Sequence, residues 1–454
     1  MNSNESTRPA FAPRRITVVG CGYLGAVHAA AMAEIGHDVV GFDVDEAKVA
    51  LLSQGRTPFY EPELDELLER TLATGRLRFT TSYEEAASGA EVLFLCVGTP
   101  QAPGSNAADL KYVWSAVDNL GPLLDHPCLV VGKSTVPVGT AEHVRDRLHE
   151  IAPAGEQVRL AWNPEFLREG FAVKDTLTPD RLVVGVERPE DEQELASLYA
   201  PVLDHGMPWV VVDLATAQLV KNAANAFLAT KISFINAMAE LCEATGADVV
   251  ALADAIGYDA RIGRRFLQAG LGFGGGCLPK DIRGFMARAE ELRVDEALHF
   301  LRDVDDINRR RRRRAVEMTH ELLGGAVTGA HVAVLGAAFK PDSDDIRDSP
   351  ALDVASTLHE RGARVFVHDP KALDNARRTR PQLTYCDTAL EACKDADVVL
   401  HLTEWREYRD IDPAELAAIV ASPRILDARN ALDAPAWIGA GWTFKALGRP
   451  RVAG

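Results

Sequence analysis

Residues 16–43 read ITVVGCGYLGAVHAAAMAEIGHDVVGFD, and this stretch predicts the fold of the N-terminal part of the chain. An apolar strand leads into the glycine motif Gly20-Cys21-Gly22-Tyr23-Leu24-Gly25, an alanine-rich helix follows, and a second strand ends at Asp43. A strand, a glycine turn, a helix and a strand, with an acid about 20 residues after the motif, form a dinucleotide-binding unit. We therefore expect a Rossmann-like domain here.

Asp43 also indicates which dinucleotide binds. Its carboxylate can accept hydrogen bonds from the adenosine ribose and would repel a 2′-phosphate, so NAD is favoured over NADP. The glycines allow the pyrophosphate to approach the N-terminus of the helix. A turn that only packs the helix against a strand, with no ligand, is the alternative interpretation.

Polar residues follow three of the further strands that we expect, which are residues 91–97, 128–132, 158–162, 182–186 and 209–212. They are Thr99, the segment Lys133-Ser134-Thr135 and the segment Asn163-Pro164-Glu165. Ligands of open parallel sheets bind beyond the carboxyl ends of the strands, so these residues predict a site. Gly132-Lys133-Ser134 resembles the end of a phosphate loop, but Pro127 occupies the position of that motif's first glycine.

Composition indicates a cytoplasmic enzyme. The 454 residues suggest two or three domains, and the net charge of −17 argues against a nucleic-acid or anionic-membrane partner. The seven cysteines are scattered and form no CxxC pair, so neither a disulfide framework nor a metal site is expected. We see no signal-peptide core in residues 1–15 and no apolar run of about 18 residues.

One long helix is expected over residues 213–244, and Lys221 and Asn225 lie on the same face of it. Apolar neighbours at helical spacing place the lysine on a packed side. Desolvation and nearby cations would lower its pKa toward a value suited to proton transfer. An exposed, inert lysine is the alternative. The length of this helix suggests a connector and a dimer surface.

Residues 272–281 read GFGGGCLPKD and contain the candidate nucleophile, Cys277. Pro279 favours the first turn of a helix, and a thiol just before a helix N-terminus is favoured as the thiolate. We expect the four glycines to leave room for a sugar and a nicotinamide beside the thiol. A glycine-rich turn with an unreactive cysteine is the alternative.

Six consecutive arginines, Arg309 to Arg314, follow this loop in sequence. A nucleic-acid patch is possible, but the acidic flank and the negative net charge favour a solvated helix face with local aspartate partners.

A second α/β unit begins near residue 331, with strands expected at 332–335, 365–369, 397–403 and 425–427 and a helix at 351–361. Its first turn, residues 336–340, is a degraded glycine motif, so its ligand should differ from that of the first unit. Basic side chains near its strand ends suit a diphosphate. We therefore expect domains at 1–212 for NAD, 213–320 for the helical connector with the cysteine loop, and 321–454 for a nucleotide-linked substrate.

These motifs together resemble the UDP-glucose/GDP-mannose dehydrogenase family from about Arg15 to Arg449. The most specific matches are NPEFLRE at 163–169, KNAAN at 221–225, the GFGGGCLPKD loop, and Phe339-Lys340-Pro341 with Asp344-Asp345-Ile346-Arg347. The resemblance implies two Rossmann-like, doubly wound parallel-sheet domains joined by a long central helix.

The resemblance also implies a four-electron oxidation of the sugar's primary alcohol to a carboxylate, with two NAD and one water. Cys277 would form a thiohemiacetal and then a thioester. UDP-glucose is the expected substrate, and GDP-mannose or another UDP-hexose is the alternative. A two-electron hydroxy-acid dehydrogenase is less consistent, because it would need neither Cys277 nor a second nucleotide lobe.

Residue roles are carried over from the family motifs in the same way. The catalytic set is Cys277, Lys221, Asn225, Asp281, Thr135, Glu165 and Glu169. The cofactor set is Gly20, Gly22, Tyr23, Leu24, Gly25, Asp43, Lys48, Thr99, Thr135, Glu169 and Arg347. The substrate set is Glu165, Phe166, Leu167, Lys221, Asn225, Arg261, Phe273, Gly274, Phe339, Lys340 and Arg429.

Four positions depart from the family pattern or bear on the choice of sugar nucleotide. The family's Tyr-Glu-Pro-Gly turn ends here in Glu63, and its late Asp-Gly-Arg reads Asp427-Ala428-Arg429. Leu278 is common among the GDP-mannose enzymes, whereas the Phe339-Lys340-Pro341 segment favours UDP-glucose.

Overall fold

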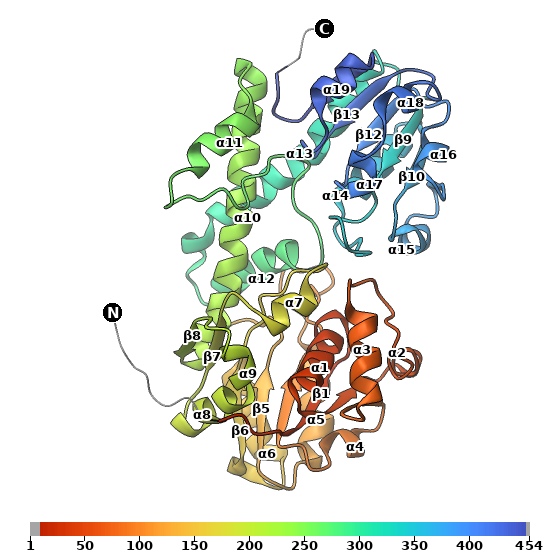
Figure 1. Ribbon diagram of the computed structural model, residues 1–454. Helices are drawn as coiled ribbons and strands as arrows, with labels where there is room; N and C mark the ends of the chain where they lie inside the picture. The colour runs from red at the N-terminus through yellow and green to blue at the C-terminus, as the bar shows by residue number, and fades with distance from the viewer. Residues whose placement is uncertain (1–9, 451–454) are drawn as a thin grey trace. The chain divides into compact units, whose positions relative to one another are not determined.

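A computed structural model describes residues 10–450 of the chain (Figure 1). The chain forms two compact units. The N-terminal unit comprises the chain up to Ala224 together with Arg283–Glu291, and the C-terminal unit comprises Asn225–Ile282 together with the chain from Leu292 onward. Each unit contains one β-sheet.

The sheet of the N-terminal unit has eight strands in the order β3-β2-β1-β4-β5-β6-β7-β8. Its central strands are almost wholly buried, as in sheets that are covered by helices on both faces. The strands are β1 (Arg15–Val19), β2 (Asp38–Phe42), β3 (Leu77–Thr80), β4 (Val92–Leu95), β5 (Cys128–Gly132), β6 (Val158–Trp162), β7 (Leu182–Gly185) and β8 (Trp209–Val212).

Strand direction is the feature of this sheet that the sequence does not reveal. Strands β1 to β6 pair in parallel, but β6 pairs with β7 in the antiparallel sense, so β7 and β8 run against the other six. Short apolar strands have the same residue pattern in either direction.

The helices of the N-terminal unit begin with α1, which follows the glycine turn and is buried along most of its length. It ends at Gly36, which has φ 119° and whose N–H donates to Ala33 O. The helices are α1 (Tyr23–Ile35), α2 (Glu46–Leu52), α3 (Leu64–Ala73), α4 (Tyr83–Ala87), α5 (Lys111–Leu120), α6 (Thr140–Ile151), α7 (Ala172–Leu177), α8 (Pro189–Leu198) and α9 (Ala200–Leu203).

Helix α10 (Leu214–Thr245) is one continuous helix of 32 residues, and it begins in the N-terminal unit and ends in the C-terminal unit (Figure 1). Further helices follow at α11 (Val249–Gly257), α12 (Leu278–Glu291) and α13 (Phe300–Leu322). No helix within residues 10–450 has the length and apolar character that crossing a membrane requires.

The C-terminal sheet has six strands, all paired in parallel, in the order β11-β10-β9-β12-β13-β14. Its strands are β9 (His331–Leu335), β10 (Arg364–His368), β11 (Thr384–Tyr385), β12 (Val398–His401), β13 (Arg424–Asp427) and β14 (Thr443–Ala446). Its helices are α14 (Pro350–Glu360), α15 (Leu373–Thr379), α16 (Ala389–Cys393), α17 (Arg406–Arg409), α18 (Pro413–Ala417) and α19 (Ala434–Gly439).

The two sheets share one detail at their first turns. Asp43, after β2, accepts a hydrogen bond from Cys21 N at 2.9 Å, and Asp369, after β10, accepts bonds from Ala337 N and Ala338 N at 2.7 and 2.9 Å. The C-terminal unit therefore keeps the link between first turn and second strand, although its glycine motif is degraded. The expectation of two Rossmann-like sheets is confirmed.

The arginine run lies on α13, and the expectation of a solvated face is wrong for its middle. Arg309 is exposed and pairs with Asp305, as expected. Arg311 is fully buried and pairs with Glu243 at 2.9 Å, and Arg312 is buried against the Phe273 carbonyl and Asp348. Six consecutive helical residues point all round the axis, so two of these guanidinium groups face the interior of the C-terminal unit.

The two departures from the family turns differ in their effect. Glu63 has φ 67°, which is the left-handed region that a glycine would occupy at low cost. Ala428 has no positive φ, and the left-handed residue of that turn is Asn430 at φ 54°. The alanine therefore imposes no backbone strain.

Candidate active site

The glycine turn of the N-terminal unit is shaped for close approach. Gly20 has φ 89°, and its N–H donates to Phe42 O. A Cβ on Gly25 would lie 1.8 Å from Gly20 O, so only glycine allows α1 to pack on the turn. A Cβ on Gly22 would meet no atom within 4 Å among the described residues, and no described side chain caps α1. The N–H groups at the start of α1 can therefore receive a pyrophosphate.

Asp43 lies at the carboxyl end of β2, beside this turn. Its carboxylate accepts hydrogen bonds from Cys21 N and from Lys48 Nζ at 2.8 Å. Two residues of the predicted cofactor set, Asp43 and Lys48, are thus brought into contact. The arrangement holds a carboxylate next to the glycine turn, as binding of a ribose requires.

Thr99 and Thr135, which follow β4 and β5, are also in contact. The Thr99 hydroxyl donates to Thr135 O at 2.7 Å, and the Ser134 hydroxyl donates to Val97 O at 2.6 Å. These bonds join two neighbouring loops at the carboxyl end of the sheet.

Glu165 and Lys221 form a buried ion pair, with 2.9 Å between Oε1 and Nζ. Leu167 N donates to the other carboxylate oxygen, and the Phe166 ring lies 5.6 Å from the ammonium. Burial alone would raise the pKa of Glu165, but Lys221 and the Leu167 N–H outweigh it and hold this pKa below its ordinary value. Four predicted residues therefore form one cluster, in which Glu165 is ionised.

Glu61 is a residue of this region that our sequence reasoning did not assign to the site. Its carboxylate accepts hydrogen bonds from Gly170 N and Ala172 N, both at 2.7 Å, and Gly170 N also donates to the Tyr23 hydroxyl. Glu61 and Tyr23 thereby fix the segment that follows Glu169. The signal available in the sequence was the Tyr60-Glu61-Pro62 motif, whose partners lie more than 100 positions away.

Cys277, the one exposed cysteine of the seven, directly precedes α12. Asp281 N donates to Cys277 O, so the acid lies one turn after the cysteine. The Asp281 carboxylate is buried and accepts from Asn225 Nδ2 at 2.6 Å and from Lys280 Nζ. The structure therefore brings Asn225 and Asp281 together beside the cysteine loop.

The four glycines of this loop are required by close packing within the C-terminal unit. A Cβ at Gly272 would lie 2.2 Å from Asn308 Oδ1, and one at Gly276 would lie 2.2 Å from the Arg347 guanidinium. At Gly275 it would lie 2.8 Å from the Phe339 ring. The glycines allow the loop to pack closely against the C-terminal unit's own residues, and the expected room for a sugar and a nicotinamide beside the thiol stays a prediction.

Arg429 joins the cysteine loop to the first turn of the C-terminal sheet. Its guanidinium donates to Gly272 O at 3.2 Å and to Phe339 O at 3.0 Å. The backbone N–H of Phe273 donates to Asn308 Oδ1, and its carbonyl accepts from Asn308 Nδ2. The Lys340 ammonium lies 5.5 Å from the Phe339 ring. Five predicted substrate residues of the C-terminal unit gather here, namely Phe273, Gly274, Phe339, Lys340 and Arg429, with Arg347 of the cofactor set beside them.

Arg261 is not among the contacts of that group. Its guanidinium forms a two-pronged bond to Asp259, and its side chain is 89% exposed. Among the described residues, its hydrogen bonds and its ion pair are confined to its own turn.

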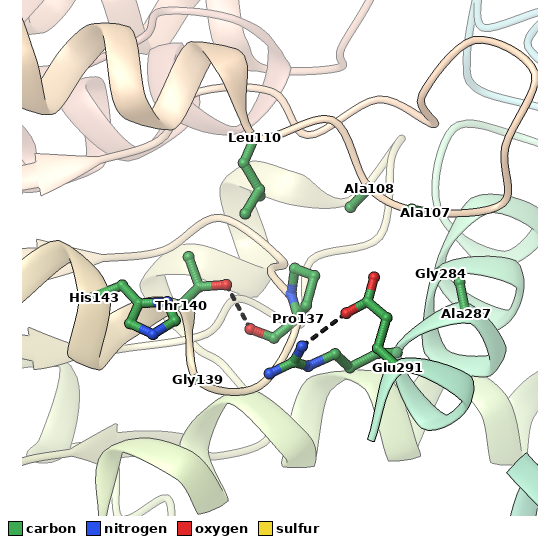
Figure 2. A pocket seen from close by; sticks show the side chains of 11 residues that line it. Ala107, Ala108, Leu110, Pro137, Gly139, Thr140, His143, Gly284, Ala287 and Glu291 are labelled. Atoms are coloured by element: carbon green, nitrogen blue, oxygen red, sulfur yellow. Dashed lines mark hydrogen bonds and ion pairs between the residues drawn. The ribbon is translucent and has the colours of Figure 1, made fainter. Parts of the chain in front are cut away.

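A cavity of about 160 Å³ lies elsewhere in the N-terminal unit, between the start of α6, residues 107–110 and α12 (Figure 2). Two interactions lie on the wall of this cavity. The Thr140 hydroxyl donates a hydrogen bond to Pro137 O, and Arg288 forms an ion pair with Glu291. No predicted site residue lines this cavity. The candidate site is therefore defined by the clusters above.

Comparison with known proteins identifies the family. Models described as the NAD binding domain, central domain and UDP binding domain of the UDP-glucose/GDP-mannose dehydrogenase family match residues 14–203, 215–310 and 333–434. UDP-glucose 6-dehydrogenase of Rickettsia typhi is 40% identical over 435 residues, which cover 95% of this chain and 99% of that protein.

Solved structures agree with this result. A UDP-glucose dehydrogenase from Pyrobaculum islandicum has a TM-score of 0.86 at 40% identity, covering 94% of this chain and 98% of that one. A UDP-D-ManNAc dehydrogenase from Pyrococcus horikoshii has a TM-score of 0.85 at 27% identity, covering 96% of this chain and 100% of that one. The chain belongs to the UDP-glucose/GDP-mannose dehydrogenase family, and its N-terminal unit carries that family's NAD-binding domain.

Proposed function

We propose that this protein is a UDP-glucose 6-dehydrogenase, which oxidises C6 of UDP-glucose from an alcohol to a carboxylate. The observation that carries the proposal is the exposed thiol of Cys277 at the start of α12, one turn before the buried Asp281–Asn225 pair. Oxidation of an aldehyde by hydride loss needs a prior addition step, which a thiolate supplies. The named relatives at 40% identity support the same substrate.

The cofactor would be held by the glycine turn and its neighbours. We assign the pyrophosphate to the N–H groups after Gly22, and the adenosine ribose to Asp43 and Lys48, which are in contact with each other. Thr99, Thr135 and Glu169 complete the set in the N-terminal unit, and Arg347 is its member in the C-terminal unit. NAD supplies the acceptor for each of the two hydrides that leave C6.

Loss of the first hydride from C6 and of the hydroxyl proton would leave an aldehyde. The Cys277 thiolate then adds to that carbon and forms a C–S bond, and the carbonyl oxygen takes up a proton as the thiohemiacetal hydroxyl. Loss of the second hydride from that carbon leaves a thioester on Cys277. Water then breaks the C–S bond, which releases the carboxylate and restores the thiol. Lys221 and Asn225 stabilise the negative oxygen of these steps.

Proton transfer is assigned to the carboxylates and Thr135. Asp281, which Asn225 and Lys280 fix in place, and Thr135 orient the water and take up its proton. Glu165 and Glu169 are the further acid–base residues. Glu165 is held ionised by Lys221, so it starts the cycle as a base.

Substrate binding is assigned to two groups of residues. Phe166 and Leu167 follow Glu165 in the N-terminal unit. Lys340, Arg429, Phe273, Gly274 and Phe339 form the C-terminal group, in which the cations suit a diphosphate. Arg261, exposed in this structure, is assigned to the nucleotide as well.

The test is to supply NAD with each sugar nucleotide and to count NADH formed per sugar oxidised. Two NADH and one uronate per UDP-glucose are expected. One NADH with a stable keto product would overturn the proposal. GDP-mannose is included because Leu278 is common in GDP-mannose enzymes. UDP-N-acetylhexosamines are included because the similar structure from Pyrococcus horikoshii is that of a UDP-D-ManNAc dehydrogenase.

The domain assignment extends the same proposal. Residues 1–212 bind NAD, residues 213–320 form the helical connector with the cysteine loop, and residues 321–454 bind the UDP-sugar. The scattered thiols favour a reducing compartment, so we assign the protein to the cytoplasm.

We also propose that the protein is a homodimer that forms through α10. Phe227, Phe234 and Leu241 recur every seven residues on this helix and are 67%, 49% and 57% exposed. Apolar side chains at this spacing lie along one face, and a helix face of this kind can pair with the same face of a second copy.

Phe234→Glu should therefore weaken self-association by at least about a hundredfold, because a two-fold interface would contain the charge twice. Analytical ultracentrifugation over a range of concentrations measures this change. The matched control is Leu390→Glu, which places the same charge at an exposed leucine of α16 and should leave the association unchanged. Equal association of all three proteins would exclude this face.

A further inference from the structure

Lys133 is a buried lysine that the roles assigned above do not use. It follows β5, is 6% exposed, and donates one hydrogen bond, to Asn163 Oδ1 at 2.9 Å. The Phe94 ring lies 5.8 Å from its ammonium. Among the described residues Asn163 Oδ1 is the one hydrogen-bond acceptor of the ammonium, and a buried charge is costly unless it is paired and hydrogen-bonded. An electrostatic role of this ammonium would account for its burial.

Asn163 links Lys133 to the segment that carries Glu165. The asparagine is fully buried, its Oδ1 also accepts from the Tyr199 hydroxyl at 2.7 Å, and its Nδ2 donates to Val183 O at 2.8 Å. Both ends of this side chain are thus fixed. Because Glu165 is only two residues further on, Lys133 restrains the start of its loop.

The titratable groups around Lys133 come from several elements, and most of them are neutral. Burial lowers the pKa of His28 on α1 well below its ordinary value. Burial raises the pKa of Cys96 after β4 to about 12, and it raises the pKa of Tyr199 as well. Glu165, whose pKa is lowered, is the charged one of these neighbours, and its carboxylate forms an ion pair with the Lys221 ammonium at 2.9 Å.

Lys133 itself is poised to change charge in the alkaline range. Burial lowers its pKa to about 8, although Cys96 and Glu165 act in the opposite direction. At pH 7 the Glu165 carboxylate therefore interacts with two ammonium groups. Well above pH 8 it interacts with Lys221 alone.

We propose that Lys133 is a positioning residue for the Glu165–Lys221 pair: through Asn163 it fixes the loop of Glu165, and its charge adds to that of Lys221 in favouring the Glu165 carboxylate. The inference rests on the proposed function in taking that pair as part of the reacting machinery. Loss of the charge disfavours the carboxylate, because burial then acts against it with one cation fewer. Lys133 thereby sets the pH range in which Glu165 works as a base.

The first test compares pH profiles of kcat and kcat/KM for the wild type and Lys133→Met, a variant of the same length without a charge. The wild type should show an inflection near pH 8 that the variant lacks. The acid limb of the variant should move upward by roughly one pH unit, because Glu165 loses a cation. Lys133→Arg, which stays charged, should keep the acid limb of the wild type and lose the inflection. Lys394→Met, at an exposed lysine, should match the wild type.

The second test needs no substrate. In protein labelled with ¹³C at the lysine Cε, the resonance that disappears in Lys133→Met should titrate near pH 8. In Glu165→Gln that titration should move to lower pH by at least about half a unit, because the carboxylate favours the ammonium. A resonance unmoved by Glu165→Gln would overturn the coupling, whether or not UDP-glucose is the substrate.

The outcomes separate the inference from the proposed function. If Lys133→Met and the wild type have superimposable pH profiles, the positioning role is wrong even if the enzyme oxidises UDP-glucose. If no sugar nucleotide is oxidised by the wild type, the proposed function fails, and the shift of the Lys133 resonance in Glu165→Gln still decides the coupling.

Discussion

Cys277→Ser should lower the rate of UDP-glucuronate formation by about a thousandfold or more, because the step after the first hydride loss needs a thiolate. A serine hydroxyl at the start of α12 stays protonated at neutral pH, so it adds poorly to the aldehyde. The variant should still bind NAD as the wild type does, since the glycine turn belongs to the N-terminal unit. Uronate is measured by chromatography and NAD binding by calorimetry.

Cys386→Ser is the matched control, because Cys386 is the next most accessible cysteine after Cys277. It should retain the wild-type rate and stoichiometry. Uronate formation at an undiminished rate in Cys277→Ser would remove this thiol from the mechanism. A loss of NAD binding in the same variant would show that the substitution acts on folding and not on the addition step.

The part of the site that sequence predicted best is the part made by neighbours in the chain. The turn from Gly20 to Gly25 requires a positive φ at Gly20 and close contact with the backbone at Gly25. Glycine meets both requirements, and the two positions lie within six residues of the sequence. The same holds for Cys277 and Asp281, which are one helical turn apart. Local spacing contains this information, so the motifs were sufficient.

The part that sequence could not predict depends on partners far along the chain. The glycines of the cysteine loop face Phe339, Arg347 and Asn308, and no pattern within the loop shows that these atoms fill the space. Arg311 lies in a run that reads as a solvated face, yet Glu243, 68 positions away, compensates its burial. Whether these residues are buried depends on tertiary packing and on the cost of burying a charge.

Lys133 combines both cases. Gly132-Lys133-Ser134 resembles the end of a phosphate loop, but Pro127 stands at the position of that motif's first glycine. The role of Lys133 was missed, since burial beside Asn163 and Glu165 becomes visible only when β5 and β6 pair. A lysine at the end of an apolar strand was the one signal available.

Lys221→Met should lower the free energy of unfolding at neutral pH by about 3–5 kcal/mol, because it leaves the Glu165 carboxylate buried without the partner of its ion pair. In the wild type the lowered pKa of Glu165 adds stability above its ordinary pKa, and this contribution is lost as pH falls through the lowered value. In the variant burial raises that pKa, so the deficit should be larger at pH 8 than at pH 5. Urea denaturation at both pH values measures the difference.

Lys221→Met should also lower kcat by about a hundredfold to a thousandfold, through loss of a cation beside the reacting oxygen. The double variant Lys221→Met/Glu165→Gln separates the two effects, because it removes the unpaired charge and keeps the shape of both side chains. Its free energy of unfolding should return most of the way to that of the wild type, while kcat stays low. If the double variant regained activity together with stability, the Lys221–Glu165 pair would have a structural role only. Stabilisation of the oxyanion would then be assigned to Asn225 alone.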